Sequence, residues 1–529
     1  MITVTKALTG RYAVISGELP ESVYDTIDDL LSCDFKGAEY SEKFRKGLWD
    51  GRIHMMYRKE LENTLIVPAG AIHNILLLFR LLRIKYEFTD QPAIDESLKC
   101  NFKWLSDKKL YDYQQMSLDK LSQNCNNNGV IEIPTGGGKT IVALSYAKNL
   151  DFPFLVLVHR AELLNQWKKE IKEVLGEDPI IIGDTVSAKK IRAAVKREET
   201  EAYKLEKERC QSLGIKPPKK CDMPKESDNI VILENANDVL EAWKSARCCI
   251  AMVQTLHSFI KDRNSPIKRI TFPVIIADEC HTTPADSVYD ILYRSTAKYI
   301  LGITATAGRA DNLEKKIFAI IGPVIESVTV EDLVDKGILA RPEFRILVPD
   351  TPIDYLCHFR YCDKPNFQTA YRDLIVGNEY RNNMIAKQAI ELLSEDRQVY
   401  VHVTQLDHGE ILNSMIPGSR VVFGNSKDRA EIIKDFTDGK IRCLISTLLK
   451  EGVNIPAISG LIFAAGYKSE ILTIQTIGRA LRRKEDGGNA VVVDCWDTSE
   501  CYVNSHTRDR MKTYEKVYGK LFNPKYIQS

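Results

Sequence analysis

Short apolar runs, each about as long as a β-strand, recur along most of this chain and alternate with stretches of helical periodicity. Strands that are apolar along their whole length are typical of a parallel sheet covered by helices on both faces. One set of runs lies at 130–133, 154–158, 274–277 and 299–304, and a second at 399–403, 420–423, 442–446, 461–463 and 490–494. This repetition predicts two successive α/β lobes, with a hinge near residues 337–342.

The first hundred residues follow a different pattern. Strand-like runs at 2–5 and 12–15 precede helical stretches at 22–33 and 69–82, which predicts a small α+β unit. The fold class is therefore α/β, with two tandem parallel-sheet lobes behind a small N-terminal domain. The expected domains are an N-terminal domain at 1–105, a first lobe at 106–338, and a second lobe at 339–529 that ends in a helical tail.

Two stretches leave alternatives open. Residues 186–246 are dense in Lys, Arg and Glu, which fits either a solvated helical insertion or a projection that grips DNA or a partner. In the tail from 508 to 526, four aromatic rings recur at a spacing of four, which would place them on one helical face. This spacing favours packing on the second lobe over stacking on DNA for Tyr514, Tyr518, Phe522 and Tyr526.

The composition is that of an ordinary globular protein, with 44% hydrophobic and 27% charged residues. The 73 Lys and Arg nearly balance the 72 Asp and Glu, so attraction to nucleic acid must come from local patches. The 13 cysteines include no CxxC pair, which favours reduced thiols over a zinc site. No signal peptide or apolar run of about 18 residues occurs, so we expect a cytoplasmic protein with no membrane partner.

A glycine-rich turn follows the run at 130–133. In such a turn, backbone N–H groups converge on phosphate oxygens at the start of the next helix, here expected at 141–150. Lys139 is expected to reach the β and γ phosphates of ATP, and the Thr140 hydroxyl to ligate Mg²⁺. Ile133 stands where the eight-residue form of this motif has its first glycine, so the match is to the shorter form that motor ATPases use. The residues expected to hold the nucleotide are Pro134, Thr135, Gly136, Gly137, Gly138, Lys139 and Thr140.

Two pairs of charged residues complete the predicted ATP site. Asp278 and Glu279 follow the run at 274–277, at the carboxyl edge of the sheet. Asp278 suits the metal ion and Glu279 suits deprotonating the attacking water, although an acidic pair elsewhere is often a helix N-cap. Arg479 and Arg482 lie three apart on one predicted helical face and suit arginine fingers that reach across a cleft, the alternative being surface arginines.

Together these residues resemble a superfamily 2 helicase from about 110 to 500, which implies RecA-like lobes and ATP-driven movement along a nucleic acid. Gln114 resembles the glutamine of the Q-motif that reads adenine, and residues 447–454 resemble motif V, although Asn454 stands where Asp is commoner. Residues 475–482 resemble motif VI, which contains both arginines. The resemblance adds Gly452 to the ATP site and implies coupling residues at His281, Thr304, Thr306 and Gln475. It also implies that the protein binds DNA phosphates without sequence preference, through Arg160, Thr255, Gln405 and Thr447.

Residues 44–53 resemble a signature of the UvsW-type helicases of T4-type phages, whose leading domain binds DNA. Arg45, Lys46 and Arg52 can neutralise phosphates, and Trp49 offers a stacking face unless it is buried as a domain anchor. This resemblance implies Holliday junction migration, fork reversal and R-loop unwinding in phage recombination, repair and replication. The partners would be branched or duplex DNA and RNA–DNA hybrids, and the protein would act in the host cytoplasm as a monomer or weak oligomer.

Three other functions remain open at this point. An RNA helicase would show the same motifs, because contacts with the backbone say little about the sugar. The motor subunit of a restriction system is less favoured, because no nuclease signature accompanies the motor. A non-hydrolysing DNA-binding scaffold conflicts with the intact Lys139, Asp278 and Glu279.

Overall fold

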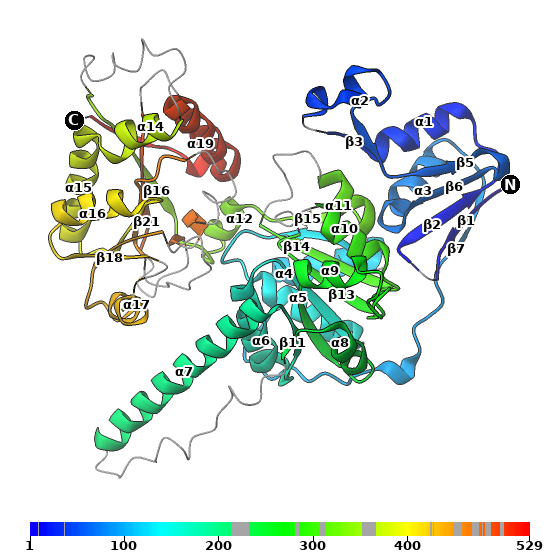
Figure 1. Ribbon diagram of the computed structural model, residues 1–529, viewed down its shortest axis with the longest axis horizontal. Helices are drawn as coiled ribbons and strands as arrows, with labels where there is room; N and C mark the ends of the chain where they lie inside the picture. Colours follow the sequence, from blue (N-terminus) through cyan, green and yellow to red (C-terminus); the bar gives the residue numbers. More distant parts are fainter. Residues whose placement is uncertain are drawn as a thin grey trace. The chain divides into compact units, whose positions relative to one another are not determined.

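The computed structural model describes residues 1–529 except 9, 36, 126, 213–231, 281–284, 306–313, 352–366, 424, 425, 427, 448–457, 468–475, 479, 482–487, 498–501 and 529. The chain divides into two compact units (Figure 1). Unit 1 comprises Met1–Ile133 and Lys139–Ser327, and unit 2 comprises Pro134–Gly138 and Val328–Ser529. The division at Ser327 falls before the predicted end of the first lobe at residue 338.

Unit 1 begins with a five-stranded sheet in the order β5-β6-β2-β1-β7, antiparallel except for the parallel pair β1 and β7. The strands predicted at 2–5 and 12–15 are confirmed. The helix predicted at 22–33 ends at Leu30, because residues 32–34 pair with residues 52–54 as strands instead. The predicted helix at 69–82 opens with a 3-10 turn, Ala69–Ala71. The elements are β1 (Ile2–Lys6), β2 (Tyr12–Ser16), α1 (Glu21–Leu30), β3 (Ser32–Asp34), α2 (Glu42–Arg45), β4 (Arg52–His54), β5 (Tyr57–Lys59), β6 (Thr64–Pro68), α3 (Ile72–Leu81) and β7 (Tyr86–Thr89).

A buried arginine joins this small sheet to the rest of unit 1. Arg11 is 2% exposed, and two of the carbonyls that it contacts end helix α11 (Glu314–Ile321), where a helix leaves its last carbonyl groups unpaired. Burial lowers the pKa of Arg11 to about 10, which leaves the guanidinium charged at neutral pH. The guanidinium donates hydrogen bonds of 3.2–3.5 Å to the carbonyl oxygens of Ala297, Lys298, Ile320 and Ile321.

The main part of unit 1 is an eight-stranded parallel sheet in the order β11-β10-β12-β9-β13-β14-β8-β15. The four predicted strands are confirmed as β8, β9, β13 and β14, and their side chains are almost wholly buried, as a sheet covered on both faces requires. The strands are β8 (Asn128–Glu132), β9 (Phe154–Val158), β10 (Ile180–Ile182), β11 (Ile232–Leu233), β12 (Cys248–Met252), β13 (Val274–Asp278), β14 (Tyr299–Thr304) and β15 (Val324–Ser327). The helices, besides α11, are α4 (Asp112–Cys125), α5 (Lys139–Leu150), α6 (Ala161–Leu175), α7 (Thr185–Ser212), α8 (Ala236–Trp243), α9 (Val253–Lys261) and α10 (Ala285–Tyr293).

The charged stretch at 186–246 begins in a long helix and later contributes a strand to the eight-stranded sheet. Helix α7 (Thr185–Ser212) projects from the rest of unit 1 in Figure 1, which confirms the helical prediction for this part. Its first turns pack against α6 through buried Ala188, Ile191 and Val195. The end of the stretch returns to the fold, because β11 pairs with β10. No helix in the described ranges, α7 included, is long and apolar enough to cross a membrane.

Unit 2 is built on a seven-stranded parallel sheet in the order β18-β19-β17-β20-β21-β16-β22. All five predicted strands are confirmed as β17–β21, whereas β16 and β22 lie outside the prediction. The strands are β16 (Pro342–Val348), β17 (Val399–His402), β18 (Ser419–Val422), β19 (Cys443–Ser446), β20 (Gly460–Phe463), β21 (Ala490–Cys495) and β22 (Lys525–Gln528). The helices are α12 (Val330–Asp335), α14 (Phe367–Tyr371), a π-helix (Arg372–Val376), α15 (Glu379–Ser394), α16 (Leu406–Met415), α17 (Arg429–Thr437) and α19 (Tyr502–Tyr518).

The aromatic tail packs on unit 2, as predicted, for three of its four rings. Tyr514 and Tyr518 are buried, and the centroids of these rings and of Phe522 lie within 5.3 Å of the Phe344 ring centroid. The prediction of one continuous helical face is wrong. The helix ends at Tyr518 because Gly519, at φ +49°, adopts the left-handed conformation that commonly ends helices. Tyr526 therefore lies in β22, where it is 56% exposed.

Candidate functional site

The glycine-rich turn lies between β8 and α5. Gly136 and Gly138 have φ angles of +90° and +78°, a region in which a side chain would be strained. The Gly137 N–H donates to the Pro134 carbonyl at 3.0 Å, and the Ile133 N–H donates to the Thr304 carbonyl at 2.9 Å. The turn therefore has an internal backbone hydrogen bond, the residue before it is bonded to the end of β14, and α5 begins directly after the turn at Lys139.

Lys139 and Glu279 form an ion pair at the carboxyl edge of the unit 1 sheet. The Lys139 Nζ lies 3.0 Å from Glu279 Oε1, and both side chains are only 13% exposed. Glu279 Oε2 accepts a hydrogen bond from the Ala305 N–H at 3.3 Å. The backbone of Glu279 is at φ +45°, an uncommon conformation for a residue other than glycine and one that recurs at functional sites.

Asp278 ends β13 and is buried, with 8% of its surface exposed. The Trp167 Nε1 of α6 donates to Asp278 Oδ2 at 2.7 Å. Burial, followed by the neighbouring charge of Glu279, raises the pKa of Asp278 to about 7, while Trp167 and Lys139 oppose the rise. The negative form of this carboxyl is therefore incompletely stabilised by the protein, and a cation beside it would compete with a proton.

The order of the strands explains why these groups meet. β14 lies between β13 and β8, so three consecutive strand ends carry the acidic pair, Thr304 and the glycine-rich turn. Thr304 is fully buried, and its backbone joins two of the three ends. The structure thus brings together Lys139, Asp278 and Glu279, which lie far apart in the sequence.

Gln114, the expected adenine reader, lies in the first turn of α4, which packs against α5 and β8. Its Oε1 accepts from the Tyr111 N–H at 2.9 Å, and its Nε2 donates to the Tyr113 hydroxyl at 3.3 Å. Gln114 is 2% exposed, so its amide is fixed in place by neighbouring residues. Its contact with adenine stays a prediction.

The expected phosphate contacts in unit 1 lie at the ends of two neighbouring strands. Arg160 follows β9 and precedes α6, and the neighbouring Gln254 donates from Nε2 to the His159 carbonyl at 3.3 Å. Thr255, in contrast, is 8% exposed and its side chain is turned into the protein. Gln254 is exposed, so it is better placed than Thr255 to meet a ligand in solution.

The two expected contacts in unit 2 also follow paired strands. Gln405 is exposed and precedes α16 after β17, and Thr447 is half-buried after β19. Because β17 and β19 are neighbours, both residues lie at the carboxyl edge of the unit 2 sheet. Their contact with DNA stays a prediction.

The expected DNA contacts of the N-terminal domain already have partners within that domain. Arg52 pairs with Asp29 at 2.9 Å and lies 3.8 Å from Asp34. The Trp49 Nε1 donates to the Arg52 carbonyl at 2.7 Å, and the Trp49 ring lies 5.7 Å from the Phe35 ring, centroid to centroid. These contacts favour Trp49 as an anchor of the 44–53 segment. Arg45 donates to the Tyr40 carbonyl at 2.9 Å, and Lys46 pairs with Glu42 at 2.5 Å.

Trp167 is a site residue that the sequence did not reveal. It is 1% exposed and lies on the buried face of an amphipathic helix, so its pattern is that of a core residue. Six residues predicted for the site lie outside the described residues: His281, Thr306, Gly452, Gln475, Arg479 and Arg482.

Family models match both parallel sheets. The model described as "Type III restriction enzyme, res subunit" matches residues 107–309, and "Helicase conserved C-terminal domain" matches residues 380–484. A solved structure of the ATP-dependent Type ISP restriction-modification enzyme LlaBIII bound to DNA has a similar fold, with a TM-score of 0.56 and 15% identity. That likeness covers 80% of this chain and 31% of that one.

Two relatives match nearly the whole chain. The DNA 3'-5' translocase XPB2 of Sulfurisphaera tokodaii is 24% identical over 522 residues, which cover 90% of this chain and 99% of the relative. The ATP-dependent DNA helicase uvsW of Enterobacteria phage T4 is 21% identical over 512 residues, covering 90% of this chain and 87% of the relative. With the two helicase domains in order along two RecA-like lobes, the chain belongs to the superfamily 2 helicases, which are ATP-dependent enzymes, and it resembles UvsW.

Proposed function

We propose that this chain is a DNA helicase or translocase that remodels branched DNA: it migrates Holliday junctions, reverses stalled forks and unwinds R-loops in phage recombination, repair and replication. The observation that carries the proposal is the meeting of Lys139, Asp278 and Glu279 beside the glycine-rich turn. The choice of DNA is supported by the names of two relatives that match nearly the full chain, a DNA translocase and a DNA helicase.

The Lys139–Glu279 pair suggests how ATP prepares its own hydrolysis. A phosphate carries more negative charge than one carboxylate, so it competes with Glu279 for the Lys139 ammonium. When Lys139 turns to the phosphate, its ion pair with Glu279 breaks, and the carboxylate becomes a stronger base than it is in that pair. Its backbone contact with Ala305 keeps the carboxylate oriented during this exchange, ready to accept a proton from water.

Asp278 and Thr140 are the residues that we propose to hold Mg²⁺. Mg²⁺ usually takes one or two protein oxygens together with substrate phosphates, and the Asp278 carboxylate and the Thr140 hydroxyl would supply such oxygens. The buried Asp278 carboxyl, whose pKa is raised, is a suitable oxygen donor because a cation would stabilise its charged form. Bound there, Mg²⁺ would neutralise charge on the transferred phosphoryl group.

The remaining roles follow the helicase resemblance. Arg479 and Arg482 would stabilise the charge that develops during phosphoryl transfer. Arg160, Gln405 and Thr447 would hold phosphates of one strand, so that binding is independent of sequence and weakens steeply with salt. Each cycle of ATP binding and hydrolysis would then advance the enzyme along that strand.

The substrate is tested with a panel of nucleic acids. ATPase rate and strand separation are measured with forks, four-way junctions, R-loops, plain duplex DNA and duplex RNA. Forks and four-way junctions are expected to give the highest rates. Equal stimulation by duplex RNA would instead indicate an RNA helicase, and activity only on long plain duplex would indicate a translocase of the restriction type.

The ATP site is tested with one substitution and a matched control. Lys139→Ala is expected to abolish turnover while leaving DNA affinity within about threefold, because DNA phosphates are bound elsewhere. Lys148→Ala changes the other end of the same helix and should leave turnover unchanged. Normal turnover by Lys139→Ala would show that the site has been assigned wrongly.

A further inference from the structure

One buried hydrogen bond joins the ATP site of unit 1 to helix α6. The Trp167 Nε1 of this helix donates to Asp278 Oδ2 at 2.7 Å, and the two residues are 1% and 8% exposed. A carboxylate that accepts from a donor fixed in the core is held in one orientation. The direction in which Asp278 presents its oxygens to a ligand therefore depends on the position of the Trp167 indole.

Helix α6 holds this indole in place because one face of the helix is buried along its length. The C-terminal end of the helix is fixed as well, since Gly176 adopts φ +72° and its N–H donates to the Lys172 carbonyl at 3.0 Å. Trp167 therefore moves together with α6 and not on its own. The apolar residues of the buried face are at most 2% exposed: Leu164, Trp167, Ile171, Val174 and Leu175.

The start of α6 lies at the same edge of the sheet as Asp278. Arg160 lies between the end of β9 and the first residue of α6. Strand β9 is the neighbour of β13, and Leu157 pairs with Ala277, the residue before Asp278. At a rise of about 1.5 Å per residue, Trp167 lies only about 10 Å along the helix from Arg160. One short length of helix thus separates the residue expected to hold a DNA phosphate from the partner of Asp278.

We propose that Trp167 is a positioning residue that links DNA binding to the Asp278 carboxylate: a DNA phosphate bound at Arg160 shifts α6, and the indole N–H carries this shift to the carboxylate. The inference rests on the proposed function, in which Arg160 binds DNA and Asp278 binds Mg²⁺. Trp167 acts through Asp278 and not on the nucleotide, as partners that orient metal ligands do. Hydrolysis thereby becomes dependent on bound DNA.

A second buried tryptophan of unit 1 provides a matched control. Trp243 of α8 is 8% exposed and packs edge to face on Phe272, with the ring centroids 5.5 Å apart. Its Nε1 is buried, and no hydrogen-bond partner for it occurs among the residues that the structure describes. Trp167→Phe and Trp243→Phe therefore remove the same atoms from the interior of unit 1, but only the first removes a hydrogen bond to a carboxylate.

The first test measures metal binding without turnover. Fluorescent ADP, bound by an excess of protein, reports the Mg²⁺ concentration that half-saturates the site. This concentration should rise about tenfold in Trp167→Phe, because partners that orient a metal ligand contribute about tenfold or more to metal affinity. The affinity for ADP in EDTA should stay within about twofold of wild type. Trp243→Phe should leave both quantities unchanged.

The second test follows the indole N–H itself by NMR. Protein labelled with ¹⁵N at its five tryptophans contains five indole N–H groups, and the resonance missing in Trp167→Phe is that of Trp167. A four-way junction bound without nucleotide should shift this resonance and leave that of Trp243 in place. In Arg160→Ala the shift should be smaller, even when the DNA concentration is raised until binding is saturated.

Two results would overturn the inference. One is an equal Mg²⁺ requirement in Trp167→Phe and Trp243→Phe, and the other is a Trp167 resonance that saturating DNA leaves in place. If Trp167→Phe does not fold, as judged by its circular dichroism spectrum, the Mg²⁺ titration is made with benzothienylalanine at this position. That side chain keeps the shape of the indole and lacks its N–H, so the same rise in the Mg²⁺ requirement is expected.

Failure of the proposed function gives a different pattern. If Asp278→Asn keeps the Mg²⁺ requirement of wild type, Asp278 does not hold the metal ion. If Arg160→Ala binds DNA as wild type at every salt concentration, Arg160 does not hold a phosphate. If both variants lose the expected binding while Trp167→Phe behaves as Trp243→Phe, only the positioning role of Trp167 is wrong.

Discussion

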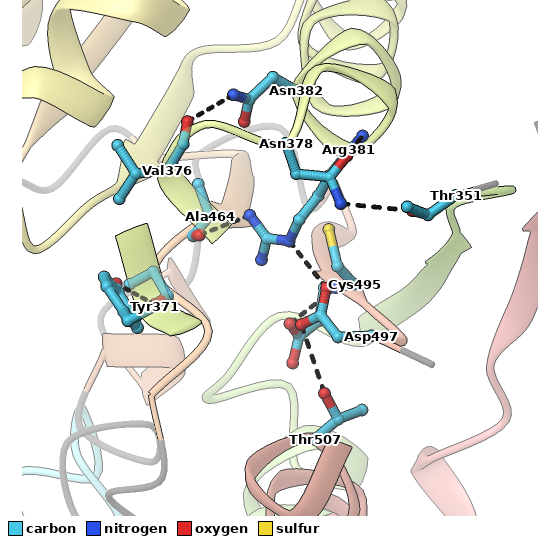
Figure 2. Close-up of polar contacts among 12 residues, drawn as sticks. Thr351, Tyr371, Val376, Asn378, Arg381, Asn382, Ala464, Cys495, Asp497 and Thr507 are labelled. Atoms are coloured by element: carbon cyan, nitrogen blue, oxygen red, sulfur yellow. Dashed lines mark hydrogen bonds and ion pairs between the residues drawn. The ribbon is translucent and has the colours of Figure 1, made fainter. Parts of the chain in front are cut away.

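Each of the two parallel sheets carries buried carboxylates at its carboxyl edge, but the partners of these carboxylates differ between the sheets. In unit 1, the described contacts of Asp278 and Glu279 include one lysine, one indole N–H and the Ala305 N–H. In unit 2, Asp494 and Asp497 face two buried arginines, and Figure 2 shows the arginine that pairs with Asp497. The anionic form of Asp278 is incompletely stabilised, which suits a site that binds a cation, whereas Asp494 and Asp497 are each paired with a buried arginine.

The pKa directions agree with this contrast. Burial raises the pKa of Asp278 to about 7, which marks an anion that the protein only partly stabilises. Burial lowers the pKa of Arg510, but the charge of Asp494 more than offsets it, so the net shift is upward. Buried carboxylates alone therefore do not identify an active site, and the balance of charge around them does.

The largest effect is expected when the acidic pair of unit 1 is changed. Glu279→Gln keeps the size of the side chain but removes the base, so kcat for ATP should fall by a factor of about 100 to 10,000. KM for ATP should change little, because Lys139 and the glycine-rich turn remain. Steady-state ATPase assays with saturating DNA measure both constants. Asp290→Asn, on α10, serves as the control and should behave as wild type; a Glu279→Gln enzyme within threefold of wild type would contradict the assignment.

The next prediction compares how one substitution in each sheet changes the free energy of unfolding. Asp494→Asn leaves Arg510 buried beside a neutral amide and should lower the free energy of unfolding by about 3–5 kcal/mol. Asp278→Asn should cost little or stabilise, because the amide removes a buried negative charge that is poorly compensated. Urea denaturation of both variants without nucleotide measures the difference. Similar losses in the two variants would mean that the carboxylates are equally well paired.

The sequence predicted the first of these clusters but not the second. Lys139, Asp278 and Glu279 are recognisable because a glycine-rich turn and an acidic pair follow apolar runs, and parallel strands bring such ends to one edge. Arg381, Asp494, Asp497 and Arg510 carry no such signal. Charged residues in amphipathic helices or at strand ends are usually solvated, and only the packing of α15 and α19 on the sheet buries them.

The ends of helices were harder to predict from the sequence than the presence of the sheet strands. All nine predicted strands of the two parallel sheets are present, because a continuous apolar run has few other stable environments. The tail helix ends at Tyr518, Phe522 follows a 3-10 turn, and Tyr526 lies in strand β22. A spacing of four in the sequence says nothing about where the helix ends, and the residues of β22 pair with residues of β16 that lie 180 positions earlier, such as Lys525 with Arg345.

A third prediction concerns pH. Burial and the neighbouring charge of Glu279 raise the pKa of Asp278 to about 7 in the folded protein, whereas an unfolded carboxyl has a pKa of about 4. Between these values the folded state binds the extra proton, so the free energy of unfolding should fall as pH rises from about 4 to about 7. Urea midpoints measured in EDTA, which removes competing cations, should show this slope in the wild type and a smaller slope in Asp278→Asn. Parallel slopes would mean that Asp278 is ionised throughout.

The smallest effect is expected for DNA affinity when Arg52 of the N-terminal domain is replaced, because carboxylates surround it. Asp29 and Asp34 surround Arg52, and Asp28 and Asp50 contact His54 at 2.8 Å and 2.9 Å. Because Arg52 is already paired in this acidic setting, Arg52→Ala should change DNA affinity by less than about twofold at 0.15 M salt. Arg160→Ala should weaken binding more and reduce its salt dependence. Fluorescence anisotropy over a range of salt concentrations measures both, and a greater loss in Arg52→Ala would show that Arg52 exchanges Asp29 for a DNA phosphate.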